Sequence, residues 1–301
     1  MKVGIIGNGF VGQATNILKC DDISVLMYDI IPEKCVPEGL TLDTMVVECE
    51  FIFISVPTPM NEDSSCDLSI VCSVVQNVSD AINRSCGENQ NKPFVVMRST
   101  VPIGTSDSLG CYFMPEFLTE KNWRQDFREC KNWFFGMPES VSVHGHSNKL
   151  FKQKITQLFH LAKSNGCILN TNIEFMSNKE AEMIKYFRNT FLAVKVSYCN
   201  EMEEFCTRNG INYENVRLHA TGDSRIGPSH SQVPGHDSRR GFGGTCFPKD
   251  TNSLLFQMKS VGMESHVLQS AVYRNENIDR SEKDWCQDIG RAVSKKNSKK
   301  K

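Results

Sequence analysis

The sequence of 301 residues contains no apolar run that approaches the roughly 20 residues needed to span a bilayer. Its formal net charge is −1, so no overall field favours nucleic acid or an anionic membrane. The first residues enter a strand pattern directly and lack the charged, apolar and small-residue zones of a signal peptide. We therefore expect a cytoplasmic protein that has neither a membrane nor a nucleic acid as a partner.

The 13 cysteines and seven histidines show no spacing that is typical of a metal site or a disulfide framework. The sequence contains no CxxC pair and no HExxH motif, and the number of cysteines is odd. His144 and His146 could share one face of a strand, although a loop fits them better. We expect no metal, and we expect most cysteines to be small buried hydrophobic residues in a reducing compartment.

Short apolar runs alternate with amphipathic stretches over the first half of the chain. The runs are Val3–Ile6, Ser24–Tyr28, Phe51–Val56, Phe94–Met97, Cys111–Met114, Trp133–Phe135 and Cys167–Leu169. Helical patterns lie among them at Val11–Lys19, Leu68–Asn83 and Lys149–Ser164. Continuous apolar runs suit strands that are covered on both faces. Strands interleaved with helices therefore predict an α/β fold with a doubly wound, parallel Rossmann sheet.

The alternation of strand and helix patterns ends near Ser177. Ser177 and Glu180 have the spacing of a capping box. No Pro or Gly follows until Gly210, so a helix of about 32 residues, roughly 48 Å long, is expected. Later elements are expected as helices at Asn215–His219, from an Asp250 N-cap to Ser260 and at Ser265–Ala292, with a loop at Thr221–Lys249. We predict a Rossmann domain over 1–175, a helical central domain over 176–290 with a subunit interface along the long helix, and a basic tail over 291–301.

Gly7, Gly9 and Gly12 form a GxGxxG motif that follows the first strand and opens a helix. Such glycines permit a tight turn, close approach of a pyrophosphate and close helix packing. Asp29 ends the next strand, 22 residues after Gly7, where an acid suits the ribose hydroxyls of NAD. Lys34 could add a contact on the adenosine side or simply be solvated. The combination predicts an NAD site, and the alternative is a glycine turn without a ligand.

Polar residues also follow three later strands. Thr58 lies in a VPTP segment and Thr100 in an RSTVP segment, and loops after strand ends form the ligand crevice of open α/β sheets. Glu116 and Glu120 lie four residues apart in PEFLTE. On a helix they would share one face as a general base beside a binding acid, or they would be a solvated first turn.

Two further groups carry chemistry. Lys185 and Asn189 lie four apart on the expected long helix among apolar neighbours, so the lysine could donate to an oxyanion or snorkel at the surface. Cys246 lies in GFGGTCFPKD, where glycines allow close approach of a ligand. Lys249 and a following helix N-terminus would lower the pKa of the thiol and make it a nucleophile toward a carbonyl. The alternative is a buried, inert cysteine.

These segments resemble the UDP-glucose/GDP-mannose dehydrogenase family. GFGGTCFPKD resembles its active-site signature, and the segments GNGFVG, YDIIPEK, FISVPTP, RSTVPIGT, MPEFLTE, IKYFRNTFLAVKVSYCNE and DSRIG occur in the family's order. The resemblance runs from Met1 to about residue 285. It implies an NAD-dependent oxidoreductase that acts on the CH–OH group of a nucleotide sugar, such as UDP-glucose, within polysaccharide biosynthesis. It also implies a homodimer that forms through the long central helix.

The resemblance implies a role for each candidate residue. Cys246 would attack the C6 aldehyde made by a first hydride transfer, and a second transfer would give a thioester that water hydrolyses to the uronic acid. Lys185 and Asn189 would stabilise oxyanions, and Asp250, Lys185 and Thr100 would handle water and protons. Glu120 would assist hydrolysis. The implied substrate contacts are Glu116, Lys185, Asn189, Gly243 and, across a subunit interface, Arg225; the implied NAD contacts are Gly7, Gly9, Gly12, Asp29, Lys34, Thr58 and Thr100.

One departure from the family bears on substrate choice. Full-length members carry a further C-terminal α/β domain that contributes to the nucleotide pocket, and this sequence ends in KKNSKKK where that domain would begin. Another chain could complete the pocket, the substrate could be smaller, or the chain could be a truncated, weakly active form. Two alternative functions stay open: an NAD-binding module without turnover, and a hydroxyacid dehydrogenase of related fold, which needs the lysine but no cysteine.

Overall fold

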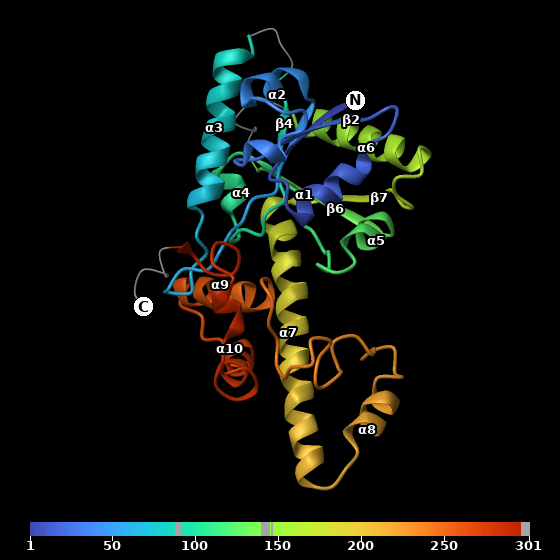
Figure 1. The fold of residues 1–301 in the computed structure, drawn as a ribbon, viewed down its shortest axis with the longest axis vertical. Helices are drawn as coiled ribbons and strands as arrows, with labels where there is room; N and C mark the ends of the chain where they lie inside the picture. The colour runs from blue at the N-terminus through green and yellow to red at the C-terminus, as the bar shows by residue number, and fades with distance from the viewer. Residues whose placement is uncertain (88–91, 140–144, 146, 296–301) are drawn as a thin grey trace. The chain divides into compact units, whose positions relative to one another are not determined.

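The structure is a computed structural model, drawn in Figure 1, that describes residues 1–87, 92–139, 145 and 147–295. His144, His146 and most of the expected basic tail lie outside the described residues. The chain divides into two compact units. Unit 1 comprises Met1–Thr58 and Leu68–Lys185, and unit 2 comprises Pro59–Asp67 and Tyr186–Lys301. No helix within the described part of the chain is long and apolar enough to cross a membrane.

Unit 1 is built on a seven-stranded sheet in the order β2-β1-β3-β4-β5-β6-β7. The strands are β1 (Lys2–Ile6), β2 (Ser24–Tyr28), β3 (Phe51–Ile54), β4 (Phe94–Met97), β5 (Tyr112–Phe113), β6 (Asn132–Met137) and β7 (Asn172–Ser177). Neighbouring strands are parallel except β5 and β6, which pair in the antiparallel direction. The predicted Rossmann sheet is confirmed, with this one antiparallel pairing as the difference.

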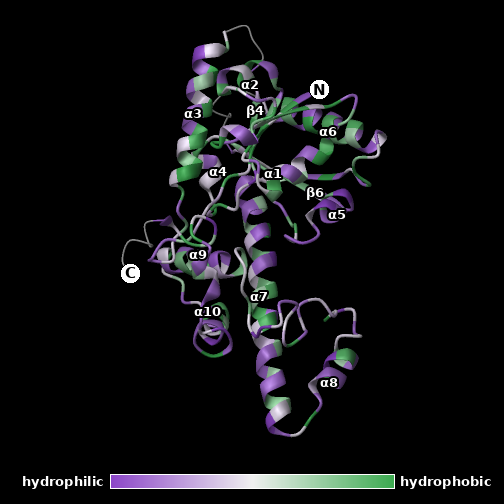
Figure 2. Cartoon of the chain, in the orientation of Figure 1, coloured by the Kyte–Doolittle hydropathy of each residue, from purple (hydrophilic) through white to green (hydrophobic). Residues whose placement is uncertain are grey.

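Helices cover both faces of the sheet (Figure 1). They are α2 (Leu42–Glu48) and α3 (Ser69–Ser85) on one face and α1 (Phe10–Thr15), α5 (Trp123–Arg128) and α6 (Asn148–Ser164) on the other. Phe51 and Phe53 belong to the α6-side core, whereas Ile52 and Ile54 belong to the α3-side core, because successive strand residues point to opposite faces. Figure 2 accordingly colours the central strand β4 as hydrophobic. Burial on both faces explains the continuous apolar runs.

The last strand of the sheet was predicted in the wrong place. Cys167–Leu169 is irregular, and the edge strand is β7 instead. Exposed and partly buried positions mix along β7 and none of its residues is fully buried, so no continuous apolar run marks it. The expected burial of most cysteines is also wrong, since four of the 13 are buried and Cys72 and Cys286 are exposed.

The long helix after Ser177 is confirmed as α7 (Asn178–Arg208, 31 residues). The capping box forms: the Ser177 N–H donates to the Glu180 carboxylate at 2.8 Å, and the Glu180 N–H donates to Ser177 Oγ at 3.3 Å. At the other end Gly210 has a φ of +66°, and the Ile211 N–H donates to the Cys206 carbonyl at 2.8 Å, as in a Schellman motif.

Unit 2 contains the remaining helices. They are the rest of α7, α8 (Tyr213–Ala220), α9 (Phe247–Ser260) and α10 (Val267–Arg274), followed by a π-helical turn at Asn275–Asp279 and a 3-10 turn at Asp284–Gln287. Asp250 is not the N-cap that was predicted, because α9 begins at Phe247 with Cys246 at the N-cap. Pro248 fits there because the first helical turn needs no N–H donor. The expected helix over Ser265–Ala292 forms as α10 and the π-helical turn as far as Asp279, and the prediction is wrong beyond that residue.

Candidate active site

The glycine-rich turn between β1 and α1 has the geometry of a pyrophosphate cradle. Gly7 has a φ of +94°, and a Cβ at Gly12 would lie 2.0 Å from the Gly7 carbonyl oxygen, so both positions require glycine. A Cβ at Gly9 would meet nothing within 4 Å, which leaves open space beside the N-terminus of α1. The turn therefore fits the pyrophosphate of a dinucleotide.

Asp29 is fixed at the end of β2. The Asn8 N–H donates to Asp29 Oδ2 at 2.8 Å, and the Ile31 N–H donates to Oδ1 at 3.0 Å. These bonds hold the carboxylate beside the glycine turn, where an acid suits ribose hydroxyls. Lys34 is exposed and its carbonyl accepts a bond from the Asn8 side chain at 2.7 Å, so its backbone supports the turn.

Two loops after neighbouring strands meet in unit 1. Thr58 and Thr100 are both buried, and Thr58 Oγ1 donates to the Thr100 carbonyl at 2.8 Å. Because β3 and β4 are adjacent and parallel, their carboxyl ends lie at the same edge of the sheet. The two threonines are thus brought together at the edge where such sheets bind ligands.

Lys185 and Glu116 form a buried ion pair. Lys185 is 3% exposed, and its Nζ donates to Glu116 Oε1 at 2.6 Å and to the Glu116 carbonyl at 2.8 Å. This placement excludes the surface lysine that stood as the alternative. Glu116 and Glu120 do not share a helical face as predicted, because residues 115–119 have no regular secondary structure; Glu116 is buried and Glu120 is exposed.

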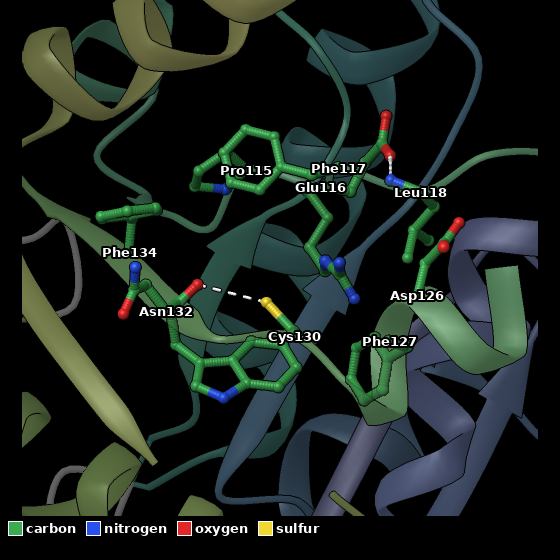
Figure 3. A pocket seen from close by; sticks show the side chains of 11 residues that line it. Pro115, Glu116, Phe117, Leu118, Asp126, Phe127, Cys130, Asn132 and Phe134 are labelled. Carbon is green, nitrogen blue, oxygen red and sulfur yellow. Dashed lines mark hydrogen bonds between the residues drawn. The ribbon is translucent and has the colours of Figure 1, made fainter. Parts of the chain in front are cut away.

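A small pocket adjoins Glu116 (Figure 3). The Leu118 N–H donates to Glu116 Oε2 at 2.8 Å. Burial alone would raise the pKa of Glu116, but the charge and hydrogen bond of Lys185, the Leu118 N–H and the charge of Arg98 lower it. Arg98 lines the same pocket and donates to Thr15 Oγ1, and burial lowers the pKa of Arg98 to about 10. Arg98 follows a buried strand, and no role was predicted for it.

Glu182 is a second buried carboxylate of unit 1, and it was not anticipated. It accepts the Gly104 N–H at 2.5 Å and the Ser106 N–H at 2.8 Å, at the start of α4 (Thr105–Ser108). Burial raises the pKa of Glu182 to about 7, against these hydrogen bonds and with help from the nearby Asp107 charge. An acid whose pKa is raised on folding stabilises the fold fully below its unfolded pKa and loses that contribution as the pH rises through its folded pKa.

We therefore expect Glu182→Gln to gain stability relative to the unsubstituted chain as the pH rises from 5 to 8. The gain in the free energy of unfolding should be about 2 kcal/mol, because the neutral amide avoids the buried charge. Urea denaturation at several pH values measures it. Glu129→Gln, an exposed substitution at the C-cap of α5, is the matched control. Equal pH dependence in both variants would contradict the assignment.

Cys246 and three polar residues gather in unit 2. Cys246 is half-buried at the N-cap of α9. Lys249 Nζ donates to Asp250 Oδ1 at 2.5 Å, and Asn189 Nδ2 donates to Asp250 Oδ2 at 2.6 Å. Burial lowers the pKa of Lys249, but attraction to the charges of Asp250 and Cys246 outweighs burial and raises it. The Lys249 ammonium and the helix N-terminus therefore both favour a thiolate at Cys246.

Two residues that the family resemblance implies as substrate contacts, Arg225 and Gly243, lie outside the group around Cys246 and Asp250. Arg225 is 88% exposed and pairs with Asp223 in its own loop at 2.5 Å. A Cβ at Gly243 would lie 2.4 Å from the guanidinium carbon of Arg280. Within the residues that the structure describes, no group of three or more His, Cys, Asp or Glu side chains is arranged to hold a metal ion.

Each unit thus holds its own group of predicted site residues. In unit 1 these are Gly7, Gly9, Gly12, Asp29, Lys34, Thr58, Thr100, Glu116, Glu120 and Lys185; in unit 2 they are Asn189, Arg225, Gly243, Cys246 and Asp250. Residues 35–153 match the NAD binding domain of the UDP-glucose/GDP-mannose dehydrogenase family, and residues 179–277 match its central domain. Together the two matches cover more than half of the chain.

The chain belongs to this family. NAD is accordingly its cofactor, which the glycine turn and Asp29 fit.

Two curated relatives of the chain are UDP-glucose 6-dehydrogenases that align with most of its length. UDP-glucose 6-dehydrogenase from Pseudomonas aeruginosa is 31% identical over 247 residues, which cover 76% of this chain and 49% of that protein. UDP-glucose 6-dehydrogenase TuaD from Bacillus subtilis is 28% identical over 317 residues, which cover 91% of this chain and 63% of that protein. The chain therefore spans less than two thirds of the length of either relative.

Solved structures share the fold. A UDP-glucose dehydrogenase from the hyperthermophilic archaeon Pyrobaculum islandicum superposes with a TM-score of 0.74 at 24% identity, covering 91% of this chain and 68% of that one. The 3-hydroxyisobutyrate dehydrogenase of Mycobacterium tuberculosis superposes with a TM-score of 0.62 at 12% identity, covering 90% of this chain and 91% of that one. Both likenesses concern the fold alone.

Proposed function

We propose that this member of the nucleotide-sugar dehydrogenase family oxidises UDP-glucose to UDP-glucuronate through a covalent intermediate on Cys246. The observation that carries the proposal is the setting of Cys246 at the N-cap of α9, with the buried pair Lys249–Asp250 in the next turn. A cation and a helix N-terminus both favour the thiolate, which is the form that attacks a carbonyl. The buried pair Lys185–Glu116 supplies a positioned ammonium of the kind that stabilises an oxyanion.

The proposed reaction balances as two oxidations and one hydrolysis. The C6 alcohol loses a proton and a hydride to become an aldehyde, and the Cys246 thiolate then adds to the aldehyde carbon to give a thiohemiacetal. Loss of a second hydride and of the hydroxyl proton gives a thioester, and water replaces the sulfur to give the carboxylate, a proton and the thiol. NAD, when bound, would supply the hydride acceptor for each oxidation, so two NADH would form per substrate.

The remaining residues receive roles that their chemistry allows. The Lys185 ammonium and the Asn189 amide would donate to the oxyanions that form at C6. Asp250, Lys185 and Thr100 would position water and accept protons, and the exposed Glu120 would assist hydrolysis. Glu116, Gly243 and, from a partner subunit, Arg225 would contact the substrate. Gly7, Gly9, Gly12, Asp29, Lys34 and Thr58 would hold the cofactor together with Thr100.

NADH formation with a panel of UDP- and GDP-sugars tests the proposed function. We expect activity with UDP-glucose and two NADH per uronate. A second candidate, a hydroxyacid dehydrogenase of related fold, would need a lysine such as the buried Lys185 but no cysteine. The panel therefore includes 3-hydroxyisobutyrate, and one NADH per turnover with it would favour that candidate. NAD binding without NADH from any substrate would instead indicate a module without turnover.

We also propose a homodimer along α7, because the unit 2 part of this helix exposes a stripe of aromatic side chains. Its members are Phe187, Phe191, Tyr198 and Phe205, each 58% to 61% exposed. The last three recur every seven residues and so lie on one helical face. Exposed apolar stripes of this kind mark protein interfaces.

We expect Phe191→Asp to weaken dimerisation by about 100-fold, because it buries a charge in place of an aromatic anchor. Light scattering over a concentration series measures the change. Arg208→Ala, at the exposed end of the same helix, is the control and should leave the dimer intact. A monomer at every concentration of the unsubstituted chain would contradict the proposed interface.

A further inference from the structure

Two side chains from the turn after α10 contact the glycine-rich loop that precedes Cys246, residues 241–244. We propose that Asn275 and Arg280 are positioning residues that fix this loop and, through it, the Cys246 nucleophile. The inference rests on the proposed role of Cys246, and it adds two residues to which that chemistry gives no part. Both are buried, at 0% and 3% exposure.

Asn275 binds the loop as a neighbouring strand would. The Phe242 N–H donates to Asn275 Oδ1 at 2.7 Å, and Asn275 Nδ2 donates to the Phe242 carbonyl at 2.9 Å. One amide therefore satisfies both buried backbone groups of Phe242. Gly241 has a φ of +68°, and a Cβ there would lie 2.3 Å from Asn275 Oδ1. The absence of a side chain at Gly241 is what lets the amide reach the loop.

Arg280 holds the next part of the loop. Its Nε and Nη2 donate to the two carboxylate oxygens of Asp284, each at 2.7 Å, and its Nη1 lies 2.7 Å from Asp237 Oδ2. A carboxylate paired at both oxygens fixes the plane of a guanidinium. A Cβ at Gly243 would lie 2.4 Å from its Cζ, so the fixed guanidinium packs directly on the Gly243 backbone.

The π-helical turn brings the two side chains to the same loop. The Arg280 N–H donates to the Asn275 carbonyl at 2.8 Å, which is the five-residue bond that defines this turn. An α-helix would instead rotate residue 280 by about 140° from residue 275 around the axis. π-helical turns are rare and frequently occur at functional sites. Here the turn explains how both residues contact one short segment.

The contacts of Asn275 and Arg280 reach the residues on both sides of Cys246. Gly243 lies three residues before Cys246. The ring of Phe242 packs edge-on against Phe247, with centroids 6.3 Å apart, and Phe247 follows Cys246 at the start of α9. Contacts on both sides thus hold the thiol at the helix N-terminus beside Lys249. Loosening the loop should let the thiol leave this position and should disfavour the thiolate.

The rate at which iodoacetamide alkylates Cys246 tests the inference. It is measured on the full chain by peptide mass spectrometry across a pH series. We expect Asn275→Ala to slow alkylation at pH 7 by about tenfold and to move the pH midpoint upward, because the thiolate is the reactive form. Asn277→Ala is the matched control, since Asn277 is exposed on the same turn and its side chain donates to the Tyr273 carbonyl one turn earlier. Exposed Cys72 of α3 provides the reference rate in each sample.

A second test uses two substitutions that compensate in size, so that it still decides if Asn275→Ala fails to fold. Gly243→Ala should slow Cys246 alkylation because the new methyl meets the Arg280 guanidinium. Adding Arg280→Lys keeps the charge, removes the planar group and should restore most of the rate. Coincident pH profiles for Asn275→Ala and Asn277→Ala would overturn the inference, as would no recovery in the pair. Absence of NADH from the unsubstituted chain would instead sink the proposed function, while the alkylation profiles still decide the positioning.

Discussion

Cys246→Ser is expected to lower UDP-glucuronate formation by on the order of 10³-fold or more, because a serine hydroxyl is not ionised at neutral pH. Without a thiolate, no thiohemiacetal forms and the second oxidation has no substrate. The affinity for NAD should be unchanged, because the glycine turn lies in unit 1 and does not involve Cys246. Uronate and NADH are measured together in the same reaction, with NAD in excess.

Cys72→Ser is the control for the loss of a thiol, since Cys72 is exposed on α3. It should retain the full rate. Retention of uronate formation in Cys246→Ser would show that the sulfur is dispensable. A reaction that needs lysine but no cysteine would then be favoured, as in the hydroxyacid dehydrogenase candidate.

Lys185→Met is expected to lower the free energy of unfolding by about 3–5 kcal/mol, because it leaves the Glu116 carboxylate buried without its nearest cation. The pair is 4% and 6% exposed, so water cannot replace the lost ammonium. The pKa of Glu116 is lowered in the fold, so its stabilisation is present at neutral pH and is lost as the pH falls through the acid range. Urea denaturation followed by circular dichroism measures the loss.

The same helix offers a matched control for that substitution. Lys179 pairs with Glu139 at 3.0 Å, but the two side chains are 51% and 64% exposed, so Lys179→Met should cost less than about 1 kcal/mol. Adding Glu116→Gln to Lys185→Met should recover most of the stability, since the unpaired charge is then gone. Equal losses from the buried and exposed lysines would contradict the assigned pairing.

Local patterns predicted the elements whose signals are short-range. The sheet strands read as apolar runs because helices cover both faces, and α7 was predicted almost to its ends by the Ser177 capping box and by Gly210. The edge strand β7 was missed because none of its residues is fully buried, so it carries no continuous apolar run. A continuous apolar run is a property of central strands.

The candidate site was predictable only where one segment carries the chemistry. GFGGTCFPKD identifies Cys246 and Lys249 directly, but Asp250 was assigned as an N-cap because its partner Asn189 lies 61 positions away. Arg98, Glu182, Asn275 and Arg280 were missed for the same reason. Each owes its surroundings to contacts between residues that are distant in sequence, which periodicity and spacing do not encode.

The most direct test of covalent catalysis is the mass of the Cys246 peptide after the chain is quenched during turnover with UDP-glucose and NAD. Glu120→Gln should slow hydrolysis and let the intermediate accumulate. The account predicts a sugar-nucleotide acyl adduct on the Cys246 peptide that requires both NAD and UDP-glucose. Formation of UDP-glucuronate with that peptide unmodified at every quench time would contradict it.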